Sequence, residues 1–375
     1  MPQPDLERIR TALATVNDPE IRRPITELEM VESVDIADDG AVTVTVLLTV
    51  AGCPLKDTIT REVTEAVGKV AGVSSVNVTL GVMSPEQRDE LKTKLRGGGA
   101  QREIPFAKPG SLTRVFAIAS GKGGVGKSSV TANLAASMAA DGLSVGVIDA
   151  DIYGFSIPSM LGVTRAPTRV DDMILPTLAH GVKVISIGMF VPSNQPVVWR
   201  GPMLHRALQQ FLTDVFWGDL DVLLLDLPPG TGDIAISVAQ LLPAAELLVV
   251  TTPQGAAADV AERAGAMAVQ THQKLVGVIE NMSWMEMPDG SRVEVFGAGG
   301  GQTVSVNLTR TIGAQVPLLG QIPLDMTVRE GSDSGQPAVL SAPDSPGAVA
   351  LRSVAKQLGR RTRGLAGRSL GLTPA

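Results

Sequence analysis

The chain has 375 residues, of which 44% are hydrophobic and 19% charged, a composition typical of a globular protein with more than one domain. A net charge of −6 and only 3% aromatic residues argue against a broad nucleic-acid surface. No apolar run reaches the roughly 18 residues of a membrane helix, and the single cysteine excludes an intrachain disulfide framework. The first residues lack the basic head and apolar stretch of a signal peptide. We therefore expect a cytoplasmic protein with neither nucleic acid nor membrane among its partners.

A small α+β domain is expected over residues 1–95. Its pattern gives an opening helix, a turn at Asn17-Asp18-Pro19-Glu20, and then an alternating strand, a helix and a second strand. The expected elements cover residues 5–15, 41–50, 57–70 and 73–80. Residues 96–112 are rich in Gly and Pro without a period, which indicates a linker.

Residues 113–360 change to short apolar strands that alternate with helices. Several of these strands are nearly continuous apolar runs, which is typical of parallel strands covered on both faces. Helices are expected at 129–140 and 204–216, among others. We therefore predict an α/β fold with a doubly wound, mostly parallel sheet. The expected strands are 115–119, 145–148, 182–187, 222–225, 247–250, 275–279 and 318–322.

The C-terminal segment is basic and contains no acidic residue after Leu351. Ser345-Pro346 is a helix start, and Leu351, Val354, Ala355 and Leu358 would share one face of that helix. A basic amphipathic helix can lie on a membrane. The short apolar face without large aromatic residues favours instead a helix packed on the domain, followed by a solvated basic tail at 361–375.

A phosphate-binding loop stands between the first strand and helix of the larger domain. Gly121-Lys-Gly-Gly-Val-Gly-Lys-Ser128 matches the pattern G-x-x-x-x-G-K-[ST] in full. Converging backbone N–H groups and the following helix N-terminus favour phosphate there. Lys127 is expected at the β- and γ-phosphates and the Ser128 hydroxyl on Mg²⁺. The predicted contacts to ATP in this loop are Gly121, Lys122, Gly123, Gly124, Val125, Gly126, Lys127, Ser128 and Ser129.

Acidic residues follow two of the predicted strands. Asp149 and Asp151 end one strand and Asp226 ends another, so all three should reach the carboxyl edge where open α/β sheets bind ligands. Asp226 suits the Walker B role of holding a magnesium-bound water. The turn Gly230-Thr231-Gly232 suits a sensor of the γ-phosphate. Together these positions predict a magnesium and water site beside the phosphates.

Base recognition is expected at the end of a later strand. Asn281 follows the strand ending at Ile279, and its amide can pair with the adenine edge. The N-K-x-D pattern of a guanine reader is absent from the sequence. ATP is therefore favoured over GTP.

The form Lys-Gly-Gly-x-Gly-Lys-Ser resembles the deviant P-loop group that includes MinD, ParA and the nitrogenase iron protein. The resemblance implies that Lys122 reaches across a homodimer to the partner's nucleotide, as an arginine finger does, and is catalytic together with Lys127. It also implies that Asp151 orients the attacking water and that Asp149 supports the metal. Backbone groups near Pro323 and Asp325 would lie beside the purine.

Longer phrases are similar to the Mrp (ApbC) family of iron–sulfur carrier ATPases. They are Asp149–Pro158, Trp199–Met203, Asp226–Asp233, Thr251–Gly255, Asn281-Met-Ser and Phe296–Gly301. The N-terminal phrases Asp18-Pro-Glu20 and Thr49-Val-Ala-Gly-Cys-Pro54 resemble a small domain of iron–sulfur assembly factors. The resemblance implies a homodimeric ATPase that holds a labile iron–sulfur cluster and passes it to apoprotein clients.

The chain departs from that family at the cluster ligands. Where the family has a Cys-x-x-Cys pair, this sequence has Met287 and Gly290, so the usual thiolate site is missing. Cys53 is the one thiol; the family makes it a candidate cluster contact, whereas a lone cysteine is commonly buried and inert. Methionines 282, 285 and 287 can be interpreted as a soft metal site or, more simply, as loop packing.

A second function class remains open at this stage. A positioning or scaffold ATPase like ParA or MinD would share the nucleotide site, and the missing cysteine pair and the basic tail favour it. The N-terminal domain and the phrases at 149–158 and 199–203 favour the iron–sulfur carrier.

Overall fold

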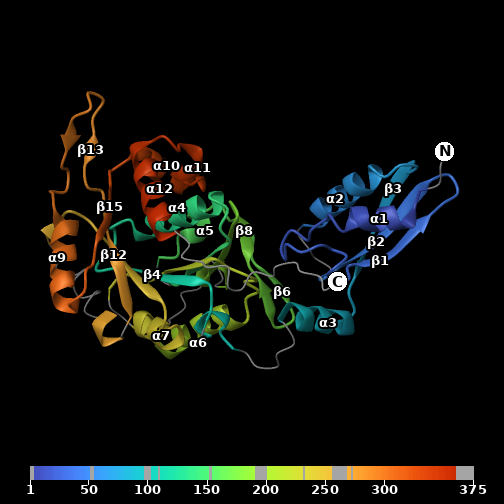
Figure 1. The fold of residues 1–375 in the computed structure, drawn as a ribbon, viewed down its shortest axis with the longest axis horizontal. Helices are drawn as coiled ribbons and strands as arrows, with labels where there is room; N and C mark the ends of the chain where they lie inside the picture. Colours follow the sequence, from blue (N-terminus) through green and yellow to red (C-terminus); the bar gives the residue numbers. More distant parts are fainter. Residues whose placement is uncertain are drawn as a thin grey trace, which may run out of the picture. The chain divides into compact units, whose positions relative to one another are not determined.

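The computed structural model describes residues 4–50, 55–96, 103–108, 110–151, 154–190, 201–230, 233–255, 268–271 and 273–359 (Figure 1). These residues fall into two compact units. Unit 1 comprises Met1–Glu103, Pro167–Thr177 and Asp214–Gly218, and unit 2 comprises Ile104–Ala166, Leu178–Thr213 and Asp219–Ala375. The break at Glu103 lies inside the stretch interpreted as a linker from the sequence. The two inserted segments of unit 1 lie within the range 113–360, which the sequence pattern predicts as one domain.

Unit 1 is built on a three-stranded sheet covered by helices. The strand order is β1 (Val31–Ile36), β2 (Ala41–Leu48), β3 (Ser75–Val82), with β1 antiparallel and β3 parallel to β2. Strand β2 alternates as its sequence predicts, and its buried valines pack with one face of α2 (Lys56–Gly68). Helices α1 (Leu6–Leu13) and α3 (Pro85–Arg96) complete the α+β arrangement.

A hairpin from the middle of the chain belongs to unit 1. Strands β6 (Thr168–Val170) and β7 (Met173–Leu175) are antiparallel, and their apolar side chains join the unit 1 core. Lys92 of α3 forms ion pairs with Asp171 at 3.1 Å and Asp172 at 3.6 Å in the turn of this hairpin. Strands of three residues carry too little periodicity to be found from sequence.

Unit 2 is built on an eight-stranded sheet with the order β15-β12-β11-β4-β10-β5-β9-β8. The pairs from β15 to β9 are all parallel. This confirms the predicted doubly wound α/β fold. The strands are β4 (Arg114–Ser120), β5 (Val145–Asp149), β8 (Thr177–Ala179), β9 (Val182–Ser186), β10 (Val222–Asp226), β11 (Glu246–Thr251), β12 (Lys274–Asn281) and β15 (Leu318–Ile322).

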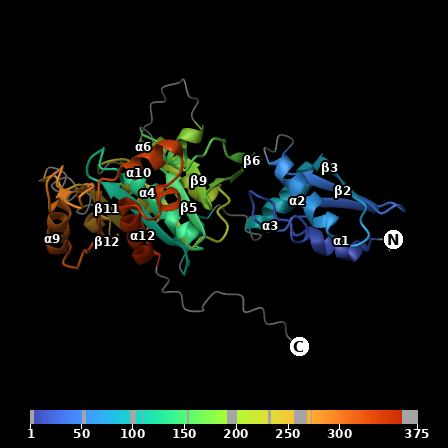
Figure 2. The same ribbon diagram turned by 90° about the horizontal axis from the view of Figure 1, so that it is seen from above.

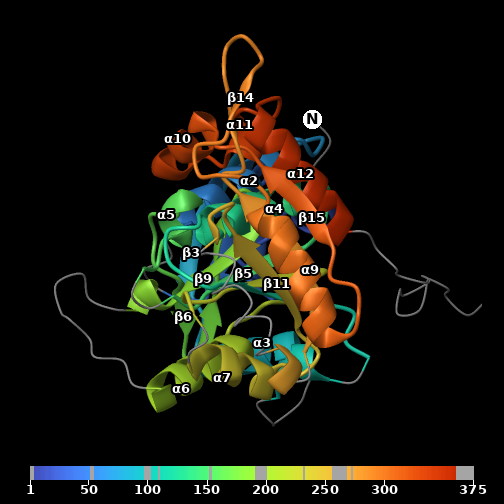
Figure 3. The same cartoon turned by 90° about the vertical axis from the view of Figure 1, so that its left-hand side faces the viewer.

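Helices cover both faces of this sheet. The helices α4 (Lys127–Ala140), α10 (Met326–Ser334), α11 (Ala338–Ser341) and α12 (Pro346–Leu358) lie on one face, and α6 (Gly201–Thr213) and α7 (Asp233–Leu241) lie on the other (Figure 3). Short elements are α5 (Ile157–Met160), η1 (Pro105–Ala107) and η2 (Ile187–Phe190). Helix α9 (Gly300–Ile312) packs on β12 and β15. A two-stranded hairpin of β13 (Met285–Glu286) and β14 (Arg292–Val293) projects from the end of β12 (Figure 1).

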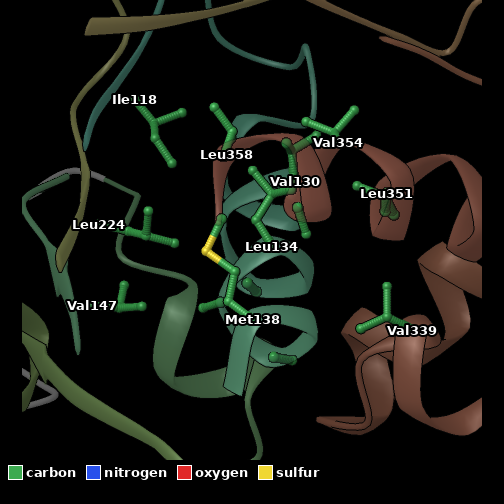
Figure 4. Close-up of a cluster of buried hydrophobic side chains, with 14 of the residues drawn as sticks. Ile118, Val130, Leu134, Met138, Val147, Leu224, Val339, Leu351, Val354 and Leu358 are labelled. Carbon is green, nitrogen blue, oxygen red and sulfur yellow. The ribbon is translucent and has the colours of Figure 1, made fainter. Parts of the chain in front are cut away.

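The helix α4 that follows the phosphate loop is buried between the sheet and α12. Leu134 and Met138 point toward strand residues such as Leu224, while the apolar face of α12 closes the cluster (Figure 4). The two helices lie side by side in both views (Figures 1 and 2). All four apolar positions predicted on α12 are buried, which confirms packing on the domain. No helix in the described part of the chain is long and apolar enough to cross a bilayer. The basic tail lies outside the described residues.

Candidate nucleotide-binding site

The phosphate loop connects the central strand β4 to α4 at the point where the strand order reverses. Gly124 and Gly126 have φ of 80° and 75°, a left-handed backbone that glycine adopts without strain. A Cβ at Gly126 would also collide with the amide of Asn281. The sequence therefore folds into a tight loop that lines a cavity of ≈ 230 Å³. The cavity is lined by Ser120, Lys122, Gly123, Gly124, Val125, Gly126, Lys127, Ser128, Ser129, Asp151, Gly154, Ser156, Met160 and Pro229.

Asp226 ties the end of β10 to the start of α4. Its carboxylate is fully buried, with Lys127 Nζ at 2.7 Å from Oδ1. The Ser128 hydroxyl donates to Oδ2 at 2.6 Å and the Thr131 hydroxyl to Oδ1 at 2.8 Å. One cation and two hydroxyls thus compensate a carboxylate that would otherwise be costly to bury. Two oxygen donors, from Ser128 and Asp226, meet beside the loop, and hard oxygen donors of this kind suit Mg²⁺.

Asp149 occupies the equivalent end of β5, directly opposite Asp226 in the strand register. Its carboxylate is fully buried and accepts hydrogen bonds from Asp151 N, Ser156 N and the Ser186 hydroxyl at 3.1–3.2 Å, and from Ile157 N at 3.3 Å. Burial, and then the negative charge of Asp226, raise the pKa of Asp149 to about 7. These hydrogen bonds connect the end of β5 to the start of α5 and to the end of β9. The expected metal support by Asp149 stays a prediction.

Asp151 and Lys122 both line the phosphate cavity. The Asp151 carboxylate accepts from Gly154 N at 3.1 Å, and the residue is 8% exposed. Its expected role in orienting the attacking water stays a prediction. Lys122 Nζ donates to the side-chain oxygen of Gln254 at 2.6 Å. Gln254 lies within the phrase Thr251–Gly255, where the sequence pattern gives it no role.

The residues expected beside the adenine base form hydrogen bonds within the protein or are buried in it. Asn281 is buried, and its Nδ2 donates to the Val125 carbonyl of the phosphate loop at 2.9 Å. Asp325 caps α10 by accepting from Thr327 N and also accepts from Gly347 N, both at 2.9 Å. Asn281, Asp325 and the buried Pro323 do not line the phosphate cavity. Their predicted contacts to adenine stay predictions.

The family's missing cysteine positions lie in the turn of the β13–β14 hairpin. Met287 N donates to Ser291 O and Gly290 N to Met287 O, both at 2.8 Å. Arg292 stacks on Trp284 at 4.2 Å from the ring centre. Among the described residues there is no group of three or more His, Cys, Asp or Glu side chains that could hold a metal. Cys53, Thr231 and Gly232 lie outside the described residues.

Comparison with known proteins agrees with this geometry. Residues 111–359 match the NUBPL iron-transfer P-loop NTPase family, and residues 6–80 match an iron–sulfur cluster assembly protein family. The iron–sulfur cluster carrier protein of Mycobacterium bovis is 65% identical over 366 residues, which cover 98% of this chain and 96% of the relative. The protein of the same name from Deinococcus radiodurans is 44% identical, with 92% and 93% covered.

One solved structure adds a nucleotide complex to these relatives. The nucleotide-binding protein of Archaeoglobus fulgidus, in complex with ADP, is 34% identical with a TM-score of 0.55, and the match covers 66% of this chain and 96% of that one. The family match spans more than half of the chain and includes the entire phosphate site. These findings confirm the resemblance drawn from the sequence: the chain belongs to the NUBPL-type family of iron-transfer P-loop NTPases.

Proposed function

We propose that the protein binds and hydrolyses ATP with Mg²⁺, acts as a homodimer in the cytoplasm, and carries iron–sulfur clusters to apoprotein clients. The observation that carries the nucleotide part is the cluster of Lys127, Ser128 and Asp226 at the base of a glycine loop. The cargo part rests on the family and on relatives named iron–sulfur cluster carrier proteins.

The site residues divide the work of phosphoryl transfer. Lys127 exchanges its ion pair with Asp226 for the β- and γ-phosphates, and the loop amides hold the remaining phosphate oxygens. Ser128 and Asp226 would hold Mg²⁺, and the ion would supply charge neutralisation at the phosphates. Asp151 orients the attacking water, and Lys122 from the other protomer stabilises the charge that develops in the transition state.

The iron–sulfur cluster is cargo in this proposal and has no complete ligand set in one chain. A cluster normally takes four strong ligands, mostly thiolates. Met287 and Gly290 supply none, so a dimer offers two thiolates at most, both from Cys53. We propose that the cluster is held weakly by Cys53 with small thiols completing the coordination.

The structure leaves no exposed apolar face on α12 for a membrane-bound positioning ATPase. The apolar face of α12, which could have lain on a membrane, is buried against α4 and the sheet. The carrier is therefore the function that the observations favour.

The experiment is anaerobic reconstitution with iron and sulfide, followed by transfer to an apo-ferredoxin monitored by absorption. The proposal expects a labile, sub-stoichiometric cluster that moves to the acceptor. A protein that hydrolyses ATP but never acquires iron under any thiol condition would contradict the carrier function and leave the nucleotide site intact.

A further inference from the structure

The side chain of Lys122 is already engaged within its own chain. Lys122 Nζ donates to Gln254 Oε1 at 2.6 Å, and both side chains are half-buried. The Ser120 hydroxyl also donates to the Lys122 carbonyl at 3.1 Å, which fixes the backbone of the lysine at the end of β4. A lysine that serves the nucleotide of another protomer must first leave this contact.

Strand order brings the two residues together. β11 is the parallel neighbour of β4, with Val250 opposite Ser120. The chain leaves both strands at the same edge, so the segment after β11 runs beside the phosphate loop. The pairing of β11 with β4 therefore places Gln254 next to Lys122.

The segment that carries Gln254 packs closely against the start of α9. Gly300, at the start of α9, lies so close that a Cβ would be 2.5 Å from the Pro253 carbonyl oxygen. Gly301 N donates to the buried Glu280 carboxylate at 2.5 Å, and Gln321 donates to the same group at 2.7 Å. The segment that carries Gln254 is therefore fixed by its packing against the start of α9. The Lys122 side chain is the group that can move when the contact breaks.

The hydrogen bond between Lys122 and Gln254 is of a kind that phosphate can displace. An amide oxygen accepts a hydrogen bond from an ammonium group but does not neutralise its charge. The lysine therefore keeps its attraction to phosphate while it is held, and a triphosphate presented by a second protomer competes well against a neutral acceptor. A carboxylate at the same place would hold the lysine by charge as well.

We infer that Gln254 is a positioning residue that holds Lys122 within its own chain until an ATP-bound partner takes the lysine. The inference rests on the proposed trans role of Lys122. It makes the hydrolysis step depend on release of the lysine from Gln254, so that in an isolated protomer the lysine stays engaged within its own chain.

The test compares Gln254→Glu and Gln254→Leu in the full chain, by steady-state ATP turnover and by ATP affinity. Glu should lower kcat by about two- to fivefold, the range that a half-exposed ion pair is worth, and added salt should reverse the loss. Leu should raise turnover by a similar factor. ATP affinity should stay within about twofold in both variants, because the phosphate loop itself is unchanged. Gln302→Glu adds the same charge at an exposed position of α9 and should behave as wild type.

A Lys122→Ala background separates a positioning effect from a structural one. With the lysine removed, turnover should fall to a residual level, and neither Gln254 substitution should change that residual turnover further. Equal losses in the Glu and Leu variants, or effects that persist without Lys122, would overturn the inference while the proposed function stands. Wild-type turnover in Lys122→Ala itself would contradict the trans role, and the inference would fall with it.

Discussion

The Ser128 hydroxyl donates a 2.6 Å hydrogen bond to the fully buried Asp226 carboxylate, so a residue of the first turn of α4 and the last residue of β10 place their oxygen atoms side by side. Lys127 supplies the positive charge that makes this burial tolerable. The same three groups therefore stabilise the nucleotide-free fold and form the nucleotide site. Substitutions here should affect stability and activity together.

Lys127→Ala should destabilise the nucleotide-free protein by about 3–5 kcal/mol, because it leaves the buried Asp226 carboxylate without its cation. Chemical denaturation of the full chain measures the change in the unfolding free energy of unit 2. The control is Lys274→Ala, which removes a lysine that is 75% exposed and should cost less than about 1 kcal/mol. A Lys127→Ala protein as stable as the control would show that Asp226 is compensated in another way.

The stability of the nucleotide-free protein should fall as the pH rises toward 7 and level off above it. Because the pKa of Asp149 is raised to about 7, the folded state binds a proton that the unfolded chain has already lost above roughly pH 4. The stabilising contribution is therefore present at low pH and lost as the pH rises through 7. Thermal unfolding between pH 5 and 8, without magnesium, should show this slope in wild type and a flatter one in Asp149→Asn. An unchanged slope in the variant would assign the dependence to other groups.

Asn281→Ala should weaken binding of ATP and GTP alike, by about three- to tenfold, because the amide braces the Val125 carbonyl of the phosphate loop. Equilibrium titration with fluorescent analogues of both nucleotides measures the two affinities. A loss confined to ATP would instead assign Asn281 to the adenine edge, as the sequence pattern suggested.

The sequence predicted seven of the eight strands of the unit 2 sheet because most of them are buried, nearly continuous apolar runs, as in Val222–Asp226. It missed β8, which has only three half-buried residues. It missed β1, where Glu32 and Asp35 interrupt the apolar pattern, and α3, which is charged on most of its surface and buries Leu91 alone among its described side chains. It placed Lys127, Ser128 and Asp226 at one edge because a motif and strand ends define that edge. The sequence did not predict the contact between Lys122 and Gln254, because only the strand order shows that β11 is the neighbour of β4.

Cys53→Ser should abolish cluster binding while ATP hydrolysis persists, because the phosphate loop belongs to the other unit. Iron and sulfide analysis after anaerobic reconstitution, with added small thiols, measures the loss. The matched control is Ser33→Ala, which removes a half-buried hydroxyl of unit 1 and should keep the wild-type iron content. A stable cluster in Cys53→Ser would show that ligands other than thiolates are sufficient.

The most direct measurement is magnesium-dependent phosphate release from ATP by the wild type, with Ser128→Ala and Lys127→Ala measured in parallel at the same protein concentration. The proposed function predicts turnover in the wild type that disappears when Mg²⁺ is chelated, and a loss of at least about a hundredfold in both variants. Turnover that survives in either variant, or a folded wild type that binds ATP with Mg²⁺ and releases no phosphate, would contradict it.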